Sequence, residues 1–402
     1  MLRLRRHNRS AKTAGIADNR DWEGAPASAT LGRGSSVASR YMRKILKLNA
    51  LSPLRQPSGI QHIRSPVPRK GTTGDGTSYL PVTSGCACWW LRLLVIGRCP
   101  SKAVSSSCGG LAMDTLVRHR RIMVAGIEVF YREAGRQDAP VVLLPHGYPC
   151  SSYEFRNLMP RLSDRWHLIA PDFPGAGYSG TPEDFDYSFD GYAAFLSSFI
   201  DALKIDRFVL YLHDFGSPIG IRMAILRPAS VVGLIIQNGD IPYEDALGPK
   251  YADIEKTWAL PLPEMKRALA EAVTEEIFRE EFLNDLEPSL AEAIPPDLWK
   301  LHWSLMTPKR KEIAVNLIAG LKENRSWFPQ HRGYLADHKP PALIVWGHND
   351  HYMPEKSARA YLRDLPDAEL HFIDGGHWLL ETHLDQVALL IRDFLARIHI
   401  RR

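Results

Sequence analysis

The stretch Arg207-Phe-Val-Leu-Tyr-Leu-His-Asp-Phe-Gly216 decides the fold of this chain. Its first six residues predict a buried strand, and a helical pattern follows over residues 217–226. Asp214 therefore lies on a tight turn between a strand and a helix. The free N–H groups at the start of that helix would stabilise a negative charge. The plainer alternative is that Asp214 only caps the helix.

Apolar runs alternate with helical stretches on both sides of this turn, which predicts a mostly parallel, doubly wound α/β sheet. The expected strands cover residues 122–124, 127–132, 141–144, 167–170, 207–212, 231–237, 342–346 and 370–373. The expected helices cover residues 151–162, 188–203, 217–226, 355–365 and 384–398. Between residues 240 and 338 the sequence has tryptophans and helical stretches but no strong strand, so we expect a helical cap there.

The first 112 residues differ in composition from the rest. They hold 18 Lys and Arg against 4 Asp and Glu, whereas residues 113–402 hold 32 against 41. Their abundance of Arg, Ser, Gly and Pro predicts a disordered extension. It could be a transit peptide, a basic arm for a polyanion, or a stretch upstream of a natural start at Met113, which we favour. The expected organisation is an extension (1–112), a core (113–239), a cap (240–338) and the rest of the core (339–402).

The bulk properties exclude several function classes. The net charge of +5 comes from the extension, so nucleic-acid binding by the remainder is not expected. Four of five cysteines lie in the extension and only Cys150 follows it, which fits a reducing, cytoplasmic compartment. No apolar run reaches the roughly 18 residues of a membrane span. We expect a small-molecule substrate and water as partners, no cofactor and no metal; the oligomeric state stays open.

Three loops carry reactive side chains at the carboxyl ends of expected strands, where open parallel sheets bind ligands. Asp214 is in the first loop. Asp350, in the loop of residues 347–354, could orient a histidine and stabilise its cation. His377 follows two glycines that allow a sharp turn. Each residue alone has an ordinary explanation as a turn or loop residue. Together they stand in the order nucleophile, acid, histidine.

With these motifs the chain from about residue 122 to 400 resembles the α/β-hydrolase superfamily, and within it the branch of epoxide hydrolases and haloalkane dehalogenases. His213-Asp-Phe-Gly216 matches their nucleophile motif, in which an aspartate replaces serine. His146-Gly-Tyr-Pro149 matches their oxyanion loop, and Asp172-Phe-Pro-Gly-Ala-Gly-Tyr-Ser179 matches the glycine-rich loop of the superfamily. The resemblance is weakest in the cap.

The resemblance implies a role for each matched residue. Asp214 would be the nucleophile, Asp350 the acid, with Asp240 as runner-up, and His377 the base. The oxyanion hole and substrate contacts would come from His146, Gly147, Tyr148 and Phe215. Attack by a carboxylate on saturated carbon gives an alkyl ester, which water activated by His377 then hydrolyses. We therefore expect Asp214→Ala to abolish alkylation and His377→Ala to trap the ester.

The leaving group separates the possible reactions. An epoxide oxygen needs a proton donor, and the candidates are cap tyrosines: Tyr243, Tyr251 and Tyr334. A halide needs N–H donors, and dehalogenases typically place Trp where this chain has Phe215. The tryptophans that could substitute are Trp258, Trp299 and Trp303. We expect an epoxide hydrolase for a small apolar epoxide. The alternatives are a haloalkane dehalogenase, another hydrolytic or lyase reaction, and a non-catalytic ligand binder on the same fold.

Overall fold

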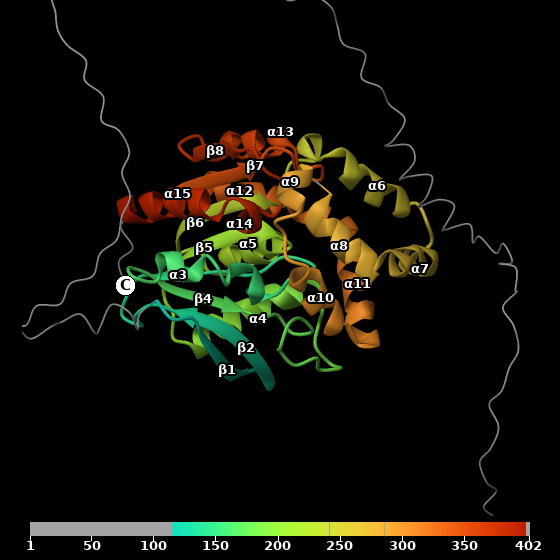
Figure 1. Ribbon diagram of the computed structural model, residues 1–402, viewed down its shortest axis with the longest axis horizontal. Helices are drawn as coiled ribbons and strands as arrows, with labels where there is room; N and C mark the ends of the chain where they lie inside the picture. The colour runs from blue at the N-terminus through green and yellow to red at the C-terminus, as the bar shows by residue number, and fades with distance from the viewer. Residues whose placement is uncertain (1–114, 241, 285, 399–402) are drawn as a thin grey trace, which may run out of the picture. The chain divides into compact units, whose positions relative to one another are not determined.

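The structure is a computed structural model that describes residues 115–240, 242–284 and 286–398. The predictions made for residues 1–112 lie outside this part. The described chain forms an eight-stranded sheet with helices on both faces (Figure 1). The strands are β1 (Arg118–Val124), β2 (Ile127–Ala134), β3 (Val141–Leu143), β4 (His167–Pro171), β5 (Phe208–Asp214), β6 (Val231–Gly239), β7 (Ala342–Gly347) and β8 (Glu369–Ile373).

The strand order is β1-β2-β4-β3-β5-β6-β7-β8. Strands β1 and β2 form an antiparallel hairpin that turns at Gly126, and β2 pairs antiparallel with β4. All the other neighbours are parallel. The predicted mostly parallel sheet is confirmed, and it brings the ends of β3, β5, β6, β7 and β8 to one edge.

Apolar side chains cover both faces of the sheet. On one face, Leu210 and Leu212 of β5 belong to a core that includes side chains of α4 (Phe189–Ala202), α5 (Gly216–Leu226), α12 (Phe328–His338) and α13 (Glu355–Ala360). On the other face, Val209 and Tyr211 pack with α3 (Met159–Leu162), α14 (Leu379–Thr382) and α15 (Leu384–Arg397). Burying each such side chain contributes about 1.5–3 kcal/mol. This double burial explains why β5 is almost wholly apolar up to His213.

Between β6 and α12 the described residues form helices joined by turns and loops, and no strand. We call its six helices the cap helices: α6 (Pro249–Thr257), α7 (Leu262–Ala272), α8 (Glu275–Leu283), α9 (Pro288–Ala291), α10 (Asp297–Ser304) and α11 (Pro308–Asn324). Helices α7, α8, α10 and α11 stand together at one end of the sheet (Figure 1). A third core, which includes Phe278 and Phe282 of α8, joins these helices to Cys150 and Trp378 of the sheet-edge loops. The division into domains at residues 113, 240 and 339 stays a prediction.

The expected helix over residues 151–162 is wrong in one respect. The structure has a short 3-10 helix, η2 (Ser152–Phe155), followed by a separate α3. Pro160 lies in the first turn of α3. Because proline has no N–H to donate to the carbonyl four residues back, a continuous helix would be interrupted there. Similarly, the helix expected over residues 355–365 ends at Ala360 and continues as η5 (Tyr361–Arg363).

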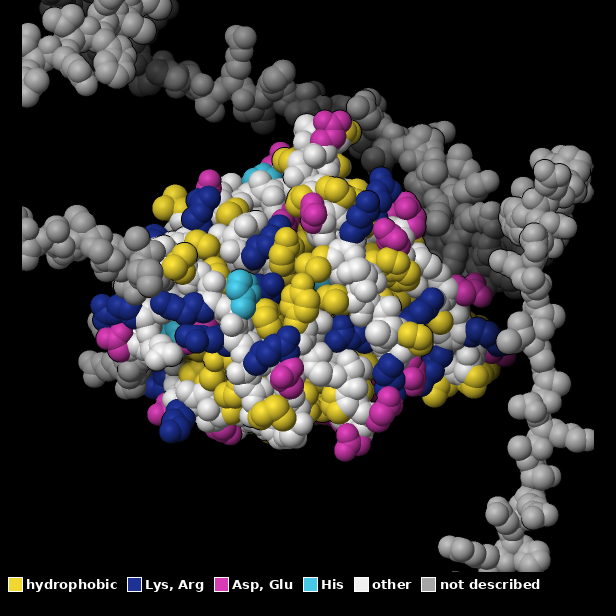
Figure 2. All heavy atoms as spheres, turned by 60° about the horizontal axis from the view of Figure 1, so that its bottom comes forward, with side chains coloured by type: hydrophobic (Ala, Val, Ile, Leu, Met, Phe, Trp, Pro, Cys, Tyr) yellow, Lys and Arg dark blue, Asp and Glu magenta, His cyan; other side chains and the backbone are white. Residues whose placement is uncertain are grey.

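The surface of the described residues mixes both signs of charge. On the face shown in Figure 2, basic and acidic side chains are interspersed with apolar ones. Among the described helices, none is long and apolar enough to cross a membrane.

Candidate active site

Asp214 ends β5 in a left-handed backbone conformation, with φ of +44°. This conformation costs a residue other than glycine about 1–3 kcal/mol, and aspartate tolerates it better than most. The strained turn lets α5 start at Gly216, directly after the strand. A Cβ atom on Gly216 would lie 2.4 Å from the carbonyl oxygen of Pro145. Only glycine therefore lets the turn lie this close to the loop that follows β3.

We expect Gly216→Ala to damage both stability and activity. The new methyl group meets backbone rather than a movable side chain, so the loop at Pro145 must shift, at about 1–3 kcal/mol of unfolding free energy. Gly333→Ala is the matched control, because a Cβ there meets nothing within 4 Å. Since Gly333 lies inside α12, alanine should raise stability by about 0.5–1 kcal/mol. Urea unfolding of both variants checks this; equal effects would contradict the proposed crowding.

Two backbone donors bind the Asp214 carboxylate. The N–H of Tyr148 donates to Oδ1 at 2.6 Å, and the N–H of Phe215 also donates to the carboxylate. The contact is close because Gly147 has no side chain: a Cβ there would lie 2.5 Å from Cβ of Asp214. Backbone donors at this position are the groups that an oxyanion hole requires, and the role expected for Tyr148 and Phe215 stays a prediction.

A buried glutamate holds this arrangement in place. Glu154 of η2 accepts the N–H of Gly147 at 3.1 Å through Oε2. Its other oxygen, Oε1, lies 2.7 Å from Nδ1 of His213, the residue before Asp214. His213 is fully buried, and its Nε2 is 3.2 Å from the carbonyl oxygen of His377. Glu154 and His213 therefore link the ends of β3, β5 and β8.

His377 lies between two carboxylates. Its Nδ1 is 2.7 Å from Oδ2 of Asp350, and its Nε2 is 3.5 Å from Oδ2 of Asp214. Asp350 also accepts the backbone N–H groups of Tyr352 and Met353, and the side-chain amide of Asn238 at 2.9 Å. These bonds fix the carboxylate that orients the imidazole, and they direct Nε2 toward Asp214.

The charges of these three groups are coupled. Burial lowers the pKa of His377, but the negative charges of Asp350 and Asp214 outweigh burial and raise the pKa well above 6.5. Burial raises the pKa of both carboxyls, yet their interaction with His377 brings each pKa below its usual value. The resting site therefore holds an imidazolium between two carboxylates.

Asp240, the runner-up for the acid, lies at the end of β6. Its carboxylate accepts the side-chain amide of Asn324 at 2.6 Å, and its backbone carbonyl accepts the hydroxyl of Tyr361. The acid that lies within hydrogen-bond distance of His377 Nδ1 is Asp350.

The expected cap contacts lie at different places. Tyr243 donates its hydroxyl to Asp364. Tyr251 is buried near the charges of Asp240 and Arg325, and Arg325 also lies 5.1 Å above the ring of Trp258. Tyr334 is buried beside His338, and Trp299 is buried in the third core. Trp303 is the last of the expected contacts. Trp303 packs on Phe278, and Phe278 packs on the ring of Tyr148. The ring of Phe278 therefore lies between Trp303 and the loop that carries Tyr148.

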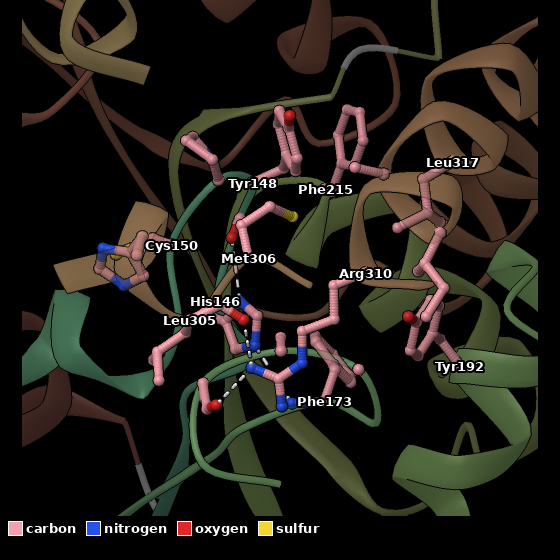
Figure 3. Close-up of a pocket in the computed structure, with 18 of the residues that line it drawn as sticks. His146, Tyr148, Cys150, Phe173, Tyr192, Phe215, Leu305, Met306, Arg310 and Leu317 are labelled. Atoms are coloured by element: carbon pink, nitrogen blue, oxygen red, sulfur yellow. Dashed lines mark hydrogen bonds between the residues drawn. The ribbon is translucent and has the colours of Figure 1, made fainter. Parts of the chain in front are cut away.

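An apolar pocket, partly open to solvent, lies beside Asp214. Gly147, Tyr148 and Phe215, which contact Asp214, line it, although Asp214 and His377 do not. Figure 3 shows Tyr148 and Phe215 at one end, and His146 and Arg310 toward the other. Burial lowers the pKa of His146, whose Nε2 accepts the N–H of Phe173, so this side chain is neutral. Arg310 binds the carbonyl oxygens of Gly177, Ser179 and Leu305.

Glu154 and Asn238 were not predicted from the sequence as site residues. Neither belongs to a motif, and both act through contacts that only the folded sheet creates. Asn238 shares a positive φ with Asp214, which no local pattern signals. Among the described residues, no group of three His, Cys, Asp or Glu is arranged to hold a metal ion.

Known proteins resemble this chain in sequence and fold. A family model described as alpha/beta hydrolase fold matches residues 140–384. An uncharacterized hydrolase of Saccharomyces cerevisiae is 33% identical over 290 residues, which cover 68% of this chain and 96% of that protein. A haloalkane dehalogenase of Mesorhizobium japonicum is 27% identical and covers 71% of this chain and 93% of its own length. The crystal structure of haloalkane dehalogenase DbeA from Bradyrhizobium elkani is similar in fold, with a TM-score of 0.57 at 24% identity, covering 70% of this chain and 98% of that one.

The family match spans most of the described residues, including all three loops that carry Asp214, Asp350 and His377. The yeast relative exceeds 30% identity over nearly its whole length. The mostly parallel sheet of the described residues agrees with the fold named by the family model. This chain therefore belongs to the α/β-hydrolase fold family and is a hydrolase.

Proposed function

We propose that this enzyme hydrolyses a small apolar epoxide through an ester of Asp214. The observation that carries the proposal is the position of the two carboxylate oxygens. Oδ1 accepts the backbone N–H of Tyr148, whereas Oδ2 faces His377. A carboxylate placed in this way needs no deprotonation to attack, and its second oxygen already occupies the site where an oxyanion would form.

The reaction has two steps. In the first, Oδ2 of Asp214 bonds to the substrate carbon while the carbon–oxygen bond of the epoxide breaks. In the second, His377 takes a proton from water, and that water attacks Cγ of the ester. Formation of the ester removes the charge of Asp214, which is one of the two that raise the pKa of His377. The histidine can then release the proton it holds at rest, and it becomes a base when the second step requires one.

The pocket supports an apolar substrate. Its walls carry aromatic and aliphatic side chains, and His146 is neutral. Two indole N–H groups are engaged elsewhere: that of Trp378 donates to the carbonyl of Glu281, and that of Trp346 to the carbonyl of Met353. Because a leaving halide needs such donors and Phe215 has none, an epoxide is the favoured substrate.

Haloalkane hydrolysis is the second candidate. It is favoured by the relatives that bear the name haloalkane dehalogenase and by the same Asp214 geometry, which serves both reactions. The indole of Trp258 has a buried N–H without a partner among the described residues, so it is the donor to test for this candidate.

Heavy-oxygen water tests the ester mechanism. With enzyme in excess over styrene oxide, one turnover in H₂¹⁸O should place ¹⁸O in the carboxylate of Asp214 and leave the diol unlabelled. The reason is that water attacks Cγ of the ester and not the substrate carbon. Mass spectrometry of the peptide that contains Asp214 measures the label. A diol labelled in the first turnover would show direct attack by water and overturn the proposal.

A further inference from the structure

Glu281 of cap helix α8 lies above the site among three groups that contact the catalytic residues. Phe278, one turn earlier on α8, packs its ring against Tyr148 at 5.8 Å. The indole N–H of Trp378 donates to the backbone carbonyl of Glu281 at 2.9 Å, and Trp378 follows His377. The hydroxyl of Tyr352 donates to Oε1 of Glu281 at 3.0 Å.

The Tyr352 bond holds the carboxyl beside the loop of Asp350, and the other two contacts place this turn of α8 against Tyr148 and Trp378. Tyr352 uses its backbone N–H to bind Asp350 and its hydroxyl to bind Glu281. Tyr352 therefore positions both the carboxylate of Asp350 and the carboxyl of Glu281. With Oε1 accepting the Tyr352 hydroxyl, Oε2 is the oxygen that can carry a proton.

The groups that face Glu281 come from the cap and from the sheet edge. Burial raises its pKa above 4.5, the positive charges of Lys250 and His377 and the hydrogen bond of Tyr352 lower it, and Asp214 raises it. The net direction is upward, so Glu281 holds its proton at a higher pH than an exposed glutamate does. Lys250 lies 4.6 Å from the ring of Tyr352, on the cap side of the same cluster.

We propose that Glu281 is the proton donor to the epoxide oxygen in the first step, a role that rests on the proposed function. As Oδ2 of Asp214 bonds to carbon, the electron pair of the breaking carbon–oxygen bond moves to oxygen, which takes the proton of Glu281. With the charge of Asp214 removed, His377 passes its resting proton through solvent to Glu281. Water then adds to Cγ and gives a proton to His377. The acyl–oxygen bond of the ester breaks, and the departing oxygen takes the proton from His377. Asp214 is left as a carboxylic acid, which gives its proton to His377 and restores the resting site, and the net reaction is epoxide plus water to diol.

The geometry assigns this role to a different residue from the tyrosines expected from the sequence. The hydroxyl of Tyr243 is used by Asp364. Tyr251 lies in the field of Asp240 and Arg325, whereas Glu281 lies in the field of Asp214 and His377. Helix α8 carries no tyrosine, so its face toward the site can supply a proton only from a carboxyl.

The test measures ester formation alone, in the His377→Ala background, with two probes of similar size. Styrene oxide needs a proton donor and benzyl bromide does not. We expect Glu281→Gln to slow alkylation of Asp214 by styrene oxide at least about 100-fold and to change alkylation by benzyl bromide less than about threefold. Wild-type Glu281 should give a rate with styrene oxide that declines as pH rises through the pKa of Glu281, and Glu281→Gln should lose this decline. Mass spectrometry of the peptide that contains Asp214 follows both reactions.

Two variants control for structure. Glu281→Asp keeps an acid with a shorter reach and should recover part of the styrene oxide rate. Glu275→Gln removes an exposed glutamate from the first turn of the same helix and should change neither rate. Equal loss with both probes, or no loss with either, overturns the role of Glu281 while leaving the ester mechanism intact. If neither probe alkylates Asp214 even with Glu281 present, the proposed function fails, and this role fails with it.

Discussion

The His377→Ala enzyme is expected to stop after one chemical step, with the substrate bonded to Asp214. Ester formation uses Oδ2 and the backbone donors at Tyr148 and Phe215, none of which the substitution removes. Hydrolysis of the ester needs a base 3.5 Å from Oδ2, which is missing. Multiple turnover should fall by on the order of 10⁴-fold or more. Intact-protein mass spectrometry after incubation with a panel of epoxides and alkyl halides will show the adduct and identify the preferred leaving group.

The variant His377→Gln controls for structural damage caused by removing the imidazole. The substitution leaves Asp350 without its imidazole partner, although Asn238, Tyr352 and Met353 still bind the carboxylate. His377→Gln fills the space and offers an amide to Asp350. Both variants should accumulate the ester at unchanged melting temperature within a few degrees. Substrate consumption without an adduct in either variant would contradict the assignment of His377 to the second step.

The Asp214→Asn enzyme is expected to form no adduct with any substrate, alone or combined with His377→Ala. An amide oxygen is a far weaker nucleophile than a carboxylate, so the first step should be slowed by on the order of 10⁴-fold or more. Asparagine suits the position because it tolerates the left-handed backbone and can still accept from Tyr148. Loss of the charge should also lower the pKa of His377, which Asp214 raises in the wild type. NMR titration of the imidazole measures this second effect.

Deamidation of the new asparagine would restore aspartate and activity with time. Rates should therefore be measured on protein whose mass still shows the amide. Adduct formation by intact Asp214→Asn protein would place the nucleophile elsewhere, and a pKa of His377 that does not fall would contradict its coupling to the charge of Asp214.

Strand periodicity was enough to predict the sheet and the positions of Asp214, Asp350 and His377. Asp214 ends β5, and Asp350 and His377 lie in the loops after β7 and β8; in a parallel sheet the ends of the strands meet at one edge. A residue at such an end is therefore located by the fold alone. The same reasoning left Asp350 and Asp240 as alternatives, because both follow strands; only the 2.7 Å contact with His377 distinguishes them.

The remaining site residues depend on geometry that periodicity does not encode. Glu154 reaches Gly147 because the helix expected over residues 151–162 breaks and η2 lies under the oxyanion loop. Asn238 reaches Asp350 across two neighbouring strands. The cap was harder still: which face of α8 turns toward the sheet depends on packing among six helices. For this reason the sequence offered cap tyrosines for the role that we propose for Glu281.

The positive φ of Asp214 separates the scaffold of this site from its reactivity. The turn around residue 214 is shaped by its backbone strain, by the neighbouring glycines and by the N–H donors. Its shape does not depend on which short side chain stands at this position. His377 and Asp350 could act as base and acid for a hydroxyl nucleophile at this position as readily as for a carboxylate. A single substitution at this position could therefore redirect the enzyme from saturated carbon to acyl groups without a change in architecture. Membership of this fold family alone then says less about the reaction than the identity of residue 214 does.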